Sequence, residues 1–167
     1  AGAVVLGPTE EDRGILSTHL HADGRFLRDL WLEIPSARCA GRVSKELLDQ
    51  GRHYPQMNGK KIFKMAVEKL PEVVHEALDA NGLTVDDIDL LVPHQANIRI
   101  NEFAGRALKL SPEKVYHNIQ RYGNTTAASI PIALNEAIQE GKAKKGDIIM
   151  LAAFGSGLTW ASCVLRL

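Results

Sequence analysis

Three short polar segments of the sequence carry residues that could do chemistry, and each follows an element that would hold it in place. The first holds His94, which comes just after the apolar run 88–92 and a proline. A buried strand that ends in histidine is a common way to place a catalytic imidazole at the edge of a sheet. The second segment, 122–129, predicts a tight turn into a helix, and the third, 153–160, predicts a glycine hairpin between two strands.

His94 and Asn124 could together hold a carbonyl oxygen while negative charge develops on it. A neutral imidazole N–H and a carboxamide N–H that converge on one point form an oxyanion site without formal charge, and they stabilise an enolate without protonating it outright. A third donor could come from the backbone around Ser156, whose glycine neighbours let a substrate approach closely. Taken singly, a histidine after a strand and a Gly-Asn pair are more often structural. The residues alone therefore leave both interpretations open.

Size and composition predict one ordinary globular domain. The chain has 167 residues, of which 45% are apolar and 24% charged, and its formal net charge of zero argues against general affinity for nucleic acid. No apolar run approaches the roughly 20 residues of a membrane span, and no signal peptide opens the chain. Cys39 and Cys163 show neither a disulfide framework nor metal-ligand spacing. We therefore predict a cytoplasmic protein.

Apolar periodicity predicts an α/β domain with a mixed sheet, in which strands alternate with helices and a hairpin closes the chain. The longest helical pattern covers 59–81, and Pro71 inside it should kink the helix or divide it in two. Cys163 should be a buried residue of the last strand. The predicted strands are 1–7, 15–21, 88–92, 115–116, 148–153 and 158–167, and the other predicted helices are 44–50, 98–110 and 124–141.

Residues 25–58 have little regular pattern and predict a long surface segment, of the kind that often covers a site. Cys39 lies there between two arginines that could lower the pKa of its thiol. No helix clearly begins behind Cys39, so we do not expect it to be a nucleophile. Lys60, Lys61 and Lys64 crowd the first turns of the next helix, where they oppose its dipole. They suggest an anionic partner as readily as a solvated face.

His19 and His21 share one face of the predicted strand 15–21. Two histidines at positions i and i+2 can bind a metal ion, but no third ligand follows at a suitable spacing. We expect structural or solvated histidines here, and no metal site.

Three motifs, in this order and at this spacing, resemble β-ketoacyl-acyl carrier protein synthase III, a family of the thiolase superfamily. They are His94-Gln95-Ala96-Asn97 followed by Arg99, then Gly123-Asn124-Thr125, then Phe154-Gly155-Ser156-Gly157. The resemblance extends from the first residue to the last but covers only about the C-terminal half of such an enzyme. It implies that residues 1–167 form a C-terminal thiolase-like domain, with the nucleophilic cysteine on an N-terminal half absent from this chain. The start at an apolar strand without methionine favours a cut inside a larger fold.

The resemblance implies the decarboxylative Claisen condensation of acyl-coenzyme A with malonyl-acyl carrier protein, which initiates fatty acid synthesis. A cysteine of the absent half would take the acyl group from coenzyme A. The positions matching His94 and Asn124 would hydrogen-bond the malonyl thioester carbonyl and stabilise the enolate. No cofactor and no metal is implied.

The resemblance also implies contacts with the carrier protein and its pantetheine arm. Arg99 and Lys64, together with Arg106, would meet the acidic carrier protein, and Asn97 would lie along the pantetheine tunnel. Phe154 would lie beside the active centre, and Ser156 replaces a glycine, which matters little if only its backbone N–H is used. The full carrier and pantetheine set is Gln95, Ala96, Asn97, Ile98, Arg99 and Lys64, and the active-site loop is Phe154, Gly155, Ser156 and Gly157.

The tetrapeptide that begins at His94 favours the initiating class over plant-type polyketide synthases, which carry a different tetrapeptide, and over elongating synthases, which use two histidines. Two alternatives stay open. The chain could come from a related acyltransferase or condensing enzyme of secondary metabolism, or it could be a non-catalytic partner subunit or docking module. The expected partners are the N-terminal half, acyl carrier protein, acyl-coenzyme A, malonyl-acyl carrier protein and a second copy in a homodimer. We expect no nucleic acid and no membrane partner.

Overall fold

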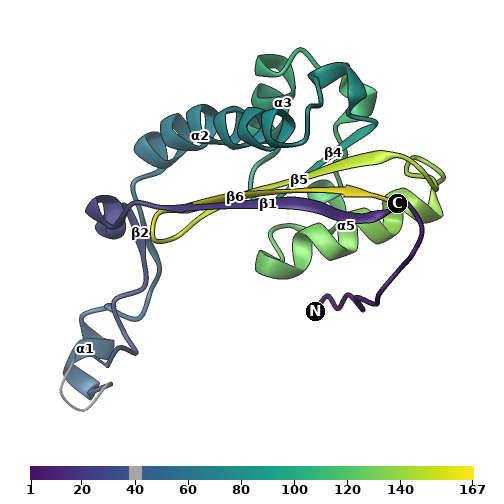
Figure 1. Cartoon of the computed structure of the whole chain (residues 1–167). Coiled ribbons are helices and arrows are strands. Elements are labelled where there is room, and N and C mark those ends of the chain that lie inside the picture. The colour runs from purple at the N-terminus through teal and green to yellow at the C-terminus, as the bar shows by residue number, and fades with distance from the viewer. Residues whose placement is uncertain (38–42) are drawn as a thin grey trace.

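The computed structural model describes residues 1–37 and 43–167, and a four-stranded mixed sheet lies at its centre (Figure 1). The sheet has the order β1-β6-β5-β4, in which β4 runs parallel to β5 and the other neighbours are antiparallel. This confirms the predicted mixed α/β class. The strands are β1 (Gly14–Ala22), β4 (Leu90–Pro93), β5 (Ile148–Gly155) and β6 (Thr159–Arg166).

Helices cover both faces of this sheet. α2 (Gly59–Ala80) and α3 (Ile98–Ala107) lie over one face, and α5 (Ser129–Gln139) lies over the other (Figure 1). The short helices are α1 (Lys45–Asp49), α4 (Ile119–Tyr122) and the 3-10 turns η1 (Gly24–Asp29), η2 (Val85–Asp87), η3 (Pro112–Lys114) and η4 (Thr126–Ala128). β2 (Leu30–Trp31) and β3 (Gln56–Met57) form a separate two-stranded ribbon.

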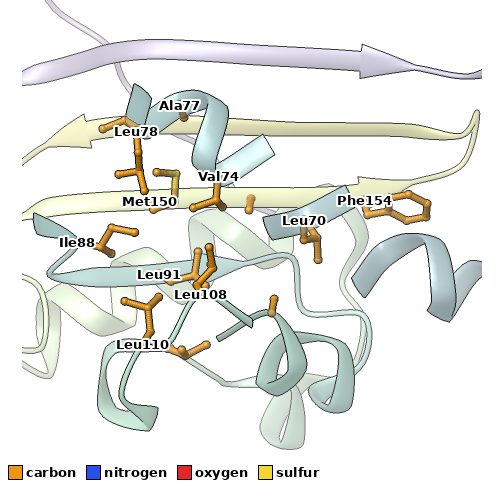
Figure 2. Packing of buried hydrophobic residues seen from close by; sticks show 14 of the residues in the cluster. Leu70, Val74, Ala77, Leu78, Ile88, Leu91, Leu108, Leu110, Met150 and Phe154 are labelled. Carbon is orange, nitrogen blue, oxygen red and sulfur yellow. The ribbon is translucent and has the colours of Figure 1, made fainter. Parts of the chain in front are cut away.

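Alternation along the strands gives the sheet two apolar cores, because successive side chains of a strand point to opposite faces. Met150 and Phe154 of β5 pack with α2 and α3 in the larger core, whereas Ile149 packs toward α5 in the smaller one. Figure 2 shows the larger core, where α2 packs on the sheet. Its buried residues include Leu70, Val74, Ala77 and Leu78 of α2, together with Ile88, Leu91, Met150 and Phe154. β4 is buried on both faces, which explains why its sequence is a continuous apolar run.

A glycine lets α3 approach the segment that leads to the Asn124 turn. A Cβ atom on Gly105 would lie 2.7 Å from Cγ2 of Val115, which is closer than carbon atoms can pack. Val115 forms a parallel bridge with Leu91 of β4, so this close approach lets α3 lie beside the end of the sheet. The predicted strand 115–116 is therefore a single bridge rather than a full strand.

Three predictions differ from the structure. Residues 1–7 form no strand, and Val5 is 96% exposed, because no described strand pairs with them. α2 continues through Pro71, so the predicted division of the helix is wrong and the alternative of a kink stays a prediction; apolar residues on both sides of the proline stay packed on the sheet. Cys163 lies in β6 but is only half-buried. Its side chain lies on the face of the sheet that α5 covers, and α5 packs mainly on β4. Cys39 lies outside the described residues.

The other predicted elements are present with shifted ends, including the short helix before residue 50 and the closing hairpin. Within residues 1–37 and 43–167, no helix has both the length and the apolar character needed to cross a membrane.

Candidate active site

One cavity of about 1080 Å³ collects the residues that the sequence singled out. It lies where the ends of β4, β5 and the β5–β6 turn meet the first turns of α2, α3 and η4. Several apolar side chains complete its wall, among them Phe63 and Trp160. The predicted site residues that line it are His94, Ala96, Asn97, Asn124, Phe154, Gly155 and Ser156, whereas Gln95, Ile98, Arg99, Lys64 and Gly157 do not.

His94 is held at the end of β4 by hydrogen bonds from its backbone and its ring. Its N–H donates to the carbonyl of Ala152 (2.8 Å), which extends the β4–β5 pairing by one residue. Nδ1 of its ring lies 2.6 Å from Oγ of Ser129, the first residue of α5. With Nδ1 occupied, Nε2 is the ring nitrogen left for a ligand in the cavity.

Burial lowers the pKa of His94 below its usual value of 6.5. A buried imidazolium loses hydration, so the neutral ring is favoured. The positive end of the α5 dipole, which begins at Ser129, acts in the same direction. At neutral pH the uncharged form of the His94 ring is therefore favoured.

The turn that carries Asn124 depends on the preceding glycine. Gly123 has φ +65° and ψ −160°, a conformation that residues with a Cβ rarely adopt. The side-chain Oδ1 of Asn124 accepts a hydrogen bond from the N–H of Thr126 (2.8 Å). Because that backbone N–H can only donate, the amide oxygen of Asn124 must face Thr126. The NH₂ group of the amide is then left to donate to a ligand.

Gln95 is enclosed within the protein and connects two backbone segments, the end of β4 and residues 116–119. Its Nε2 donates to the carbonyls of Pro93 (2.7 Å) and Tyr116 (3.2 Å). Its Oε1 accepts from the N–H groups of Asn118 (3.1 Å) and Ile119 (3.3 Å). We predicted that Gln95 contacts a carrier protein and its pantetheine, but a side chain with no exposed surface is not available to either. Its hydrogen bonds instead tie the His94 loop to the segment that leads to Asn124.

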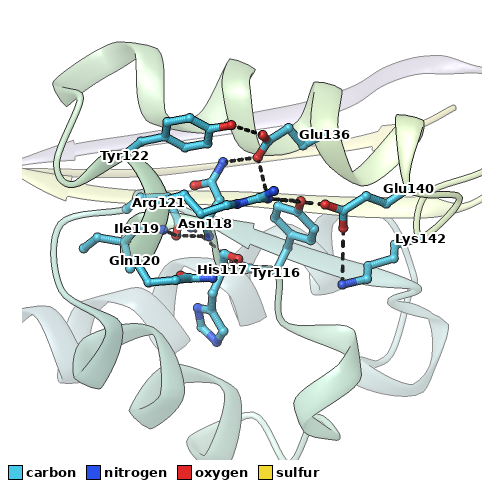
Figure 3. A network of polar contacts seen from close by, with 11 residues as sticks. Tyr116, His117, Asn118, Ile119, Gln120, Arg121, Tyr122, Glu136, Glu140 and Lys142 are labelled. Carbon is cyan, nitrogen blue, oxygen red and sulfur yellow. Dashed lines mark hydrogen bonds and ion pairs between the residues drawn. The ribbon is translucent and has the colours of Figure 1, made fainter.

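A polar network anchors α4, the helix that comes directly before the Asn124 turn, on α5 (Figure 3). Glu136 of α5 accepts hydrogen bonds from Tyr122 and from Nδ2 of Asn118 (2.8 Å), and it pairs with Nη2 of Arg121 (2.8 Å). Partial burial acts to raise the pKa of Glu136, but the hydrogen bonds and the charge of Arg121 outweigh it and lower that pKa below 4.5. The carboxylate is therefore charged at neutral pH and holds three residues of the α4 region.

Of the basic residues predicted to meet a carrier protein, Lys64 and Arg99 lie on the first turns of α2 and α3, and Arg106 lies on the last turn of α3. Lys64 and Arg99 are exposed, and they neighbour Phe63 and Ile100, which line the cavity. Lys61 instead pairs with Asp29 (2.6 Å). In the described ranges, Lys64 and Arg99 make no ion pair.

The remaining residues predicted to meet the carrier protein or its pantetheine are exposed. Asn97 caps α3, since its Oδ1 accepts from the N–H of Arg99 (3.0 Å). Arg106 lies within 3.9 Å of Glu102 on the same helix, a weak surface pair. Ala96 and Ile98 are exposed beside Asn97. Ala96, Asn97 and Ile98 thus lie exposed at the start of α3, and Arg106 lies exposed at its end.

The β5–β6 turn forms another wall of the cavity. Phe154 is almost fully buried and stacks on Trp160, with ring centroids 6.4 Å apart. Oγ of Ser156 donates to the carbonyl of Leu30 (2.6 Å), which ties the turn to β2. The side chain of Ser156 is thus engaged within the fold, and its backbone stays beside the cavity.

His19 and His21 both contact Glu76 of α2, at 3.4 Å and 2.5 Å. Among the described residues, no group of three or more His, Cys, Asp or Glu side chains could hold a metal ion. Sequence reasoning missed Ser129, because nothing local in the sequence places its hydroxyl beside a ring 35 residues earlier.

The fold and the site together define a thiolase-like protein. Residues 78–167 match the family described as 3-oxoacyl-[acyl-carrier-protein] synthase III, C-terminal. The chain belongs to this family, as the three sequence motifs predicted.

Individual relatives agree with this assignment. A β-ketoacyl-[acyl-carrier-protein] synthase III from Symbiobacterium thermophilum is 48% identical over 166 residues, which are 99% of this chain and 50% of that protein. The crystal structure of such an enzyme from Thermus thermophilus superposes with a TM-score of 0.85 at 41% identity, over 97% of this chain and 49% of that one. The priming β-ketosynthase of the R1128 polyketide pathway gives a TM-score of 0.80 at 31% identity, over 96% and 47%. The chain thus spans about half the length of the relatives it matches.

Replacing Gln95 by leucine should lower the free energy of unfolding by at least about 2 kcal/mol. Each buried backbone group left without a partner costs about 1–3 kcal/mol, and four such groups lose theirs. Urea unfolding measures the change. Gln120→Leu is the matched control, because Gln120 is exposed, and it should stay within about 0.5 kcal/mol of wild type. Equal stability of Gln95→Leu and wild type would contradict the role given to Gln95.

Replacing Glu136 by glutamine should lower stability at neutral pH, and the difference should shrink in acid. The folded pKa of Glu136 lies below the unfolded value of about 4.5, so its charge stabilises the fold fully above that pH. This contribution is lost as the pH falls through the folded pKa. Unfolding curves at a series of pH values test this, with the exposed Glu68→Gln as control. A difference that does not change with pH would argue against the charged network.

Proposed function

We propose that this chain carries the enolate-stabilising half of the active site of a β-ketoacyl-acyl carrier protein synthase III. The observation that carries the proposal is the pair of oriented donors in one cavity. His94 is neutral and keeps Nε2 free, and Asn124 has its oxygen occupied and its NH₂ group free. Two uncharged donors suit a carbonyl oxygen that gains charge during the reaction.

The chemistry proceeds in two bond-breaking steps. When the malonyl thioester loses carbon dioxide, the electrons of the broken C–C bond move into an enolate, and its oxygen takes hydrogen bonds from His94 and Asn124. The enolate carbon then attacks the carbonyl of an acyl group held as a thioester on a cysteine. The new C–C bond forms as that cysteine leaves as a thiolate. Neither step needs an added proton, which fits donors that share their protons without transferring them.

The nucleophilic cysteine of this scheme belongs to another part of the protein. Cys163 lies in β6 outside the cavity wall, and burial raises the pKa of its thiol, so it is a poor nucleophile. Exposed apolar residues offer a surface for a further segment, among them Val5 (96% exposed) and Leu20 (74% exposed). We propose that the N-terminal half of the enzyme covers this surface and brings the cysteine to the cavity.

The substrate reaches this cavity from the exposed side of α2 and α3. Lys64 and Arg99 offer positive charge beside the cavity without an ion pair in the described ranges, and an acidic carrier protein is a suitable partner. The pantetheine arm would pass Asn97 and Phe154 on its way to His94. The relatives from Symbiobacterium thermophilum and Thermus thermophilus are β-ketoacyl-[acyl-carrier-protein] synthases III, which favours the initiation of fatty acid synthesis as the activity. One similar structure is the priming β-ketosynthase of a polyketide pathway, so a role of this chain in secondary metabolism is the second candidate. A homodimer and a cytoplasmic location stay predictions.

Changing His94 or Asn124 to alanine in the full-length protein should leave acyl loading largely intact and reduce malonyl decarboxylation by roughly 10²–10³-fold. That factor is the usual effect of losing one oxyanion donor, about 2.7–4 kcal/mol. The double variant should lose less than the sum, because both donors act on one oxygen. Mass spectrometry follows acyl-enzyme formation, and release of carbon dioxide follows the second half-reaction.

The matched controls are His75→Ala and Asn135→Ala, which remove exposed side chains of α2 and α5 outside the cavity wall and should keep both half-reactions. Normal decarboxylation by both the His94 and the Asn124 variant would contradict the proposal. It would instead favour a docking module in which the loops that carry these residues have only a structural role.

A further inference from the structure

We propose that Ser129 is a positioning residue that holds His94 in the tautomer with its proton on Nε2. The role of that tautomer in decarboxylation rests on the function proposed above, but the tautomer itself does not. Ser129 is 2% exposed at the start of α5, and His94 follows β4, so the contact joins two elements on the floor of the cavity.

Two polar groups surround the hydroxyl of Ser129. Nδ1 of His94 lies 2.6 Å from its Oγ, and the backbone N of Gln95 lies 3.2 Å away. Over residues 1–37 and 43–167 these are the polar partners of that oxygen. Gln95 is itself held in place, because its side chain is hydrogen-bonded to backbone groups of Pro93, Tyr116 and Asn118.

The direction of each hydrogen bond follows from what these groups can do. The N–H of Gln95 can only donate, so it takes one lone pair of Oγ. The single proton of the hydroxyl then has Nδ1 as its available acceptor. If Nδ1 carried a proton, two N–H groups would point at one oxygen, and the hydroxyl proton would be buried without an acceptor. A buried donor without a partner is costly, so Nδ1 stays unprotonated and the ring proton lies on Nε2.

This contact prepares the donor before any substrate arrives. Without it, the neutral ring could exchange its proton between the two nitrogens, and the Nδ1-protonated form offers a lone pair, not a donor, to the cavity. Ser129 therefore does for His94 what the N–H of Thr126 does for the amide of Asn124. Both donors are oriented by groups that do not themselves need to touch substrate.

Nuclear magnetic resonance of the histidine ring nitrogens in the full-length protein tests the proposal directly. The protein is labelled with ¹⁵N at histidine, and the resonances of His94 are assigned by their loss in His94→Gln. At neutral pH we expect a protonated Nε2 and an unprotonated, hydrogen-bonded Nδ1. A wild-type spectrum with the proton on Nδ1 overturns the proposal, and this measurement needs no Ser129 variant to fold.

Variants separate the hydroxyl from the packing around it. Ser129→Ala should let the two tautomers exchange, so that the shifts of the two nitrogens move toward each other, while Ser129→Thr keeps a hydroxyl and should keep the wild-type pattern. Ser162→Ala is the matched control, since it removes another buried hydroxyl, one that donates to the carbonyl of Val73 away from the site. A wild-type pattern in Ser129→Ala also overturns the proposal.

Activity gives a second readout that distinguishes the two proposals. Ser129→Ala should reduce the decarboxylation rate by about 10–100-fold, the size typical when the hydrogen-bond partner of a metal-bound histidine is removed, with acyl loading unchanged. Ser129→Thr should restore much of the rate. If wild type shows the Nε2-protonated ring but does not decarboxylate malonyl thioesters, the proposed function fails and the role of Ser129 stands.

Discussion

The site depends on how the protein satisfies the polar groups that lie where β4 ends. β4 is buried on both faces, so the backbone that follows it enters the interior with N–H and carbonyl groups that water cannot reach. Gln95 supplies partners to the carbonyl of Pro93 and to three backbone groups of residues 116–119, and Ala152 and Ser129 supply partners to His94. Because the same contacts reach the segment before Asn124, the two loops that carry the donors are fixed relative to one scaffold.

Apolar burial provides the frame for these contacts. The larger core fastens α2 and α3 to one face of the sheet, and the smaller core fastens α5 to the other. α5 matters twice, because its first residue contacts His94 and Glu136 in its third turn holds the helix before Asn124. A helix that packs on β4 thereby connects both donors to the centre of the sheet.

Much of this arrangement could be predicted from the sequence. Apolar periodicity located α2, the strand before His94 and the closing hairpin, and the resemblance of three motifs identified the residues that would meet at the cavity. Gln95 stood in one of those motifs, but a polar residue next to a histidine gives no sign that its side chain turns into the core. The contact of His94 with Ser129 was not predictable either, because it depends on how α5 packs and not on any local pattern.

Residues 1–7 show the limit of local patterns in another way. Their apolar run is typical of a strand, yet residues 1–7 pair with no strand in the part of the chain that the structure describes, so the pattern alone does not make a strand. The same reasoning applies to the site, where two donors can hold an enolate but do not supply a nucleophile.

The central claim is that His94 and Asn124 donate to one carbonyl oxygen. The most direct test is a crystal structure of the full-length protein with a malonyl thioester analogue that cannot lose carbon dioxide. The account predicts that the thioester carbonyl oxygen lies about 2.7–3.1 Å from both Nε2 of His94 and Nδ2 of Asn124. An analogue bound in the cavity with that oxygen out of reach of both donors would contradict it.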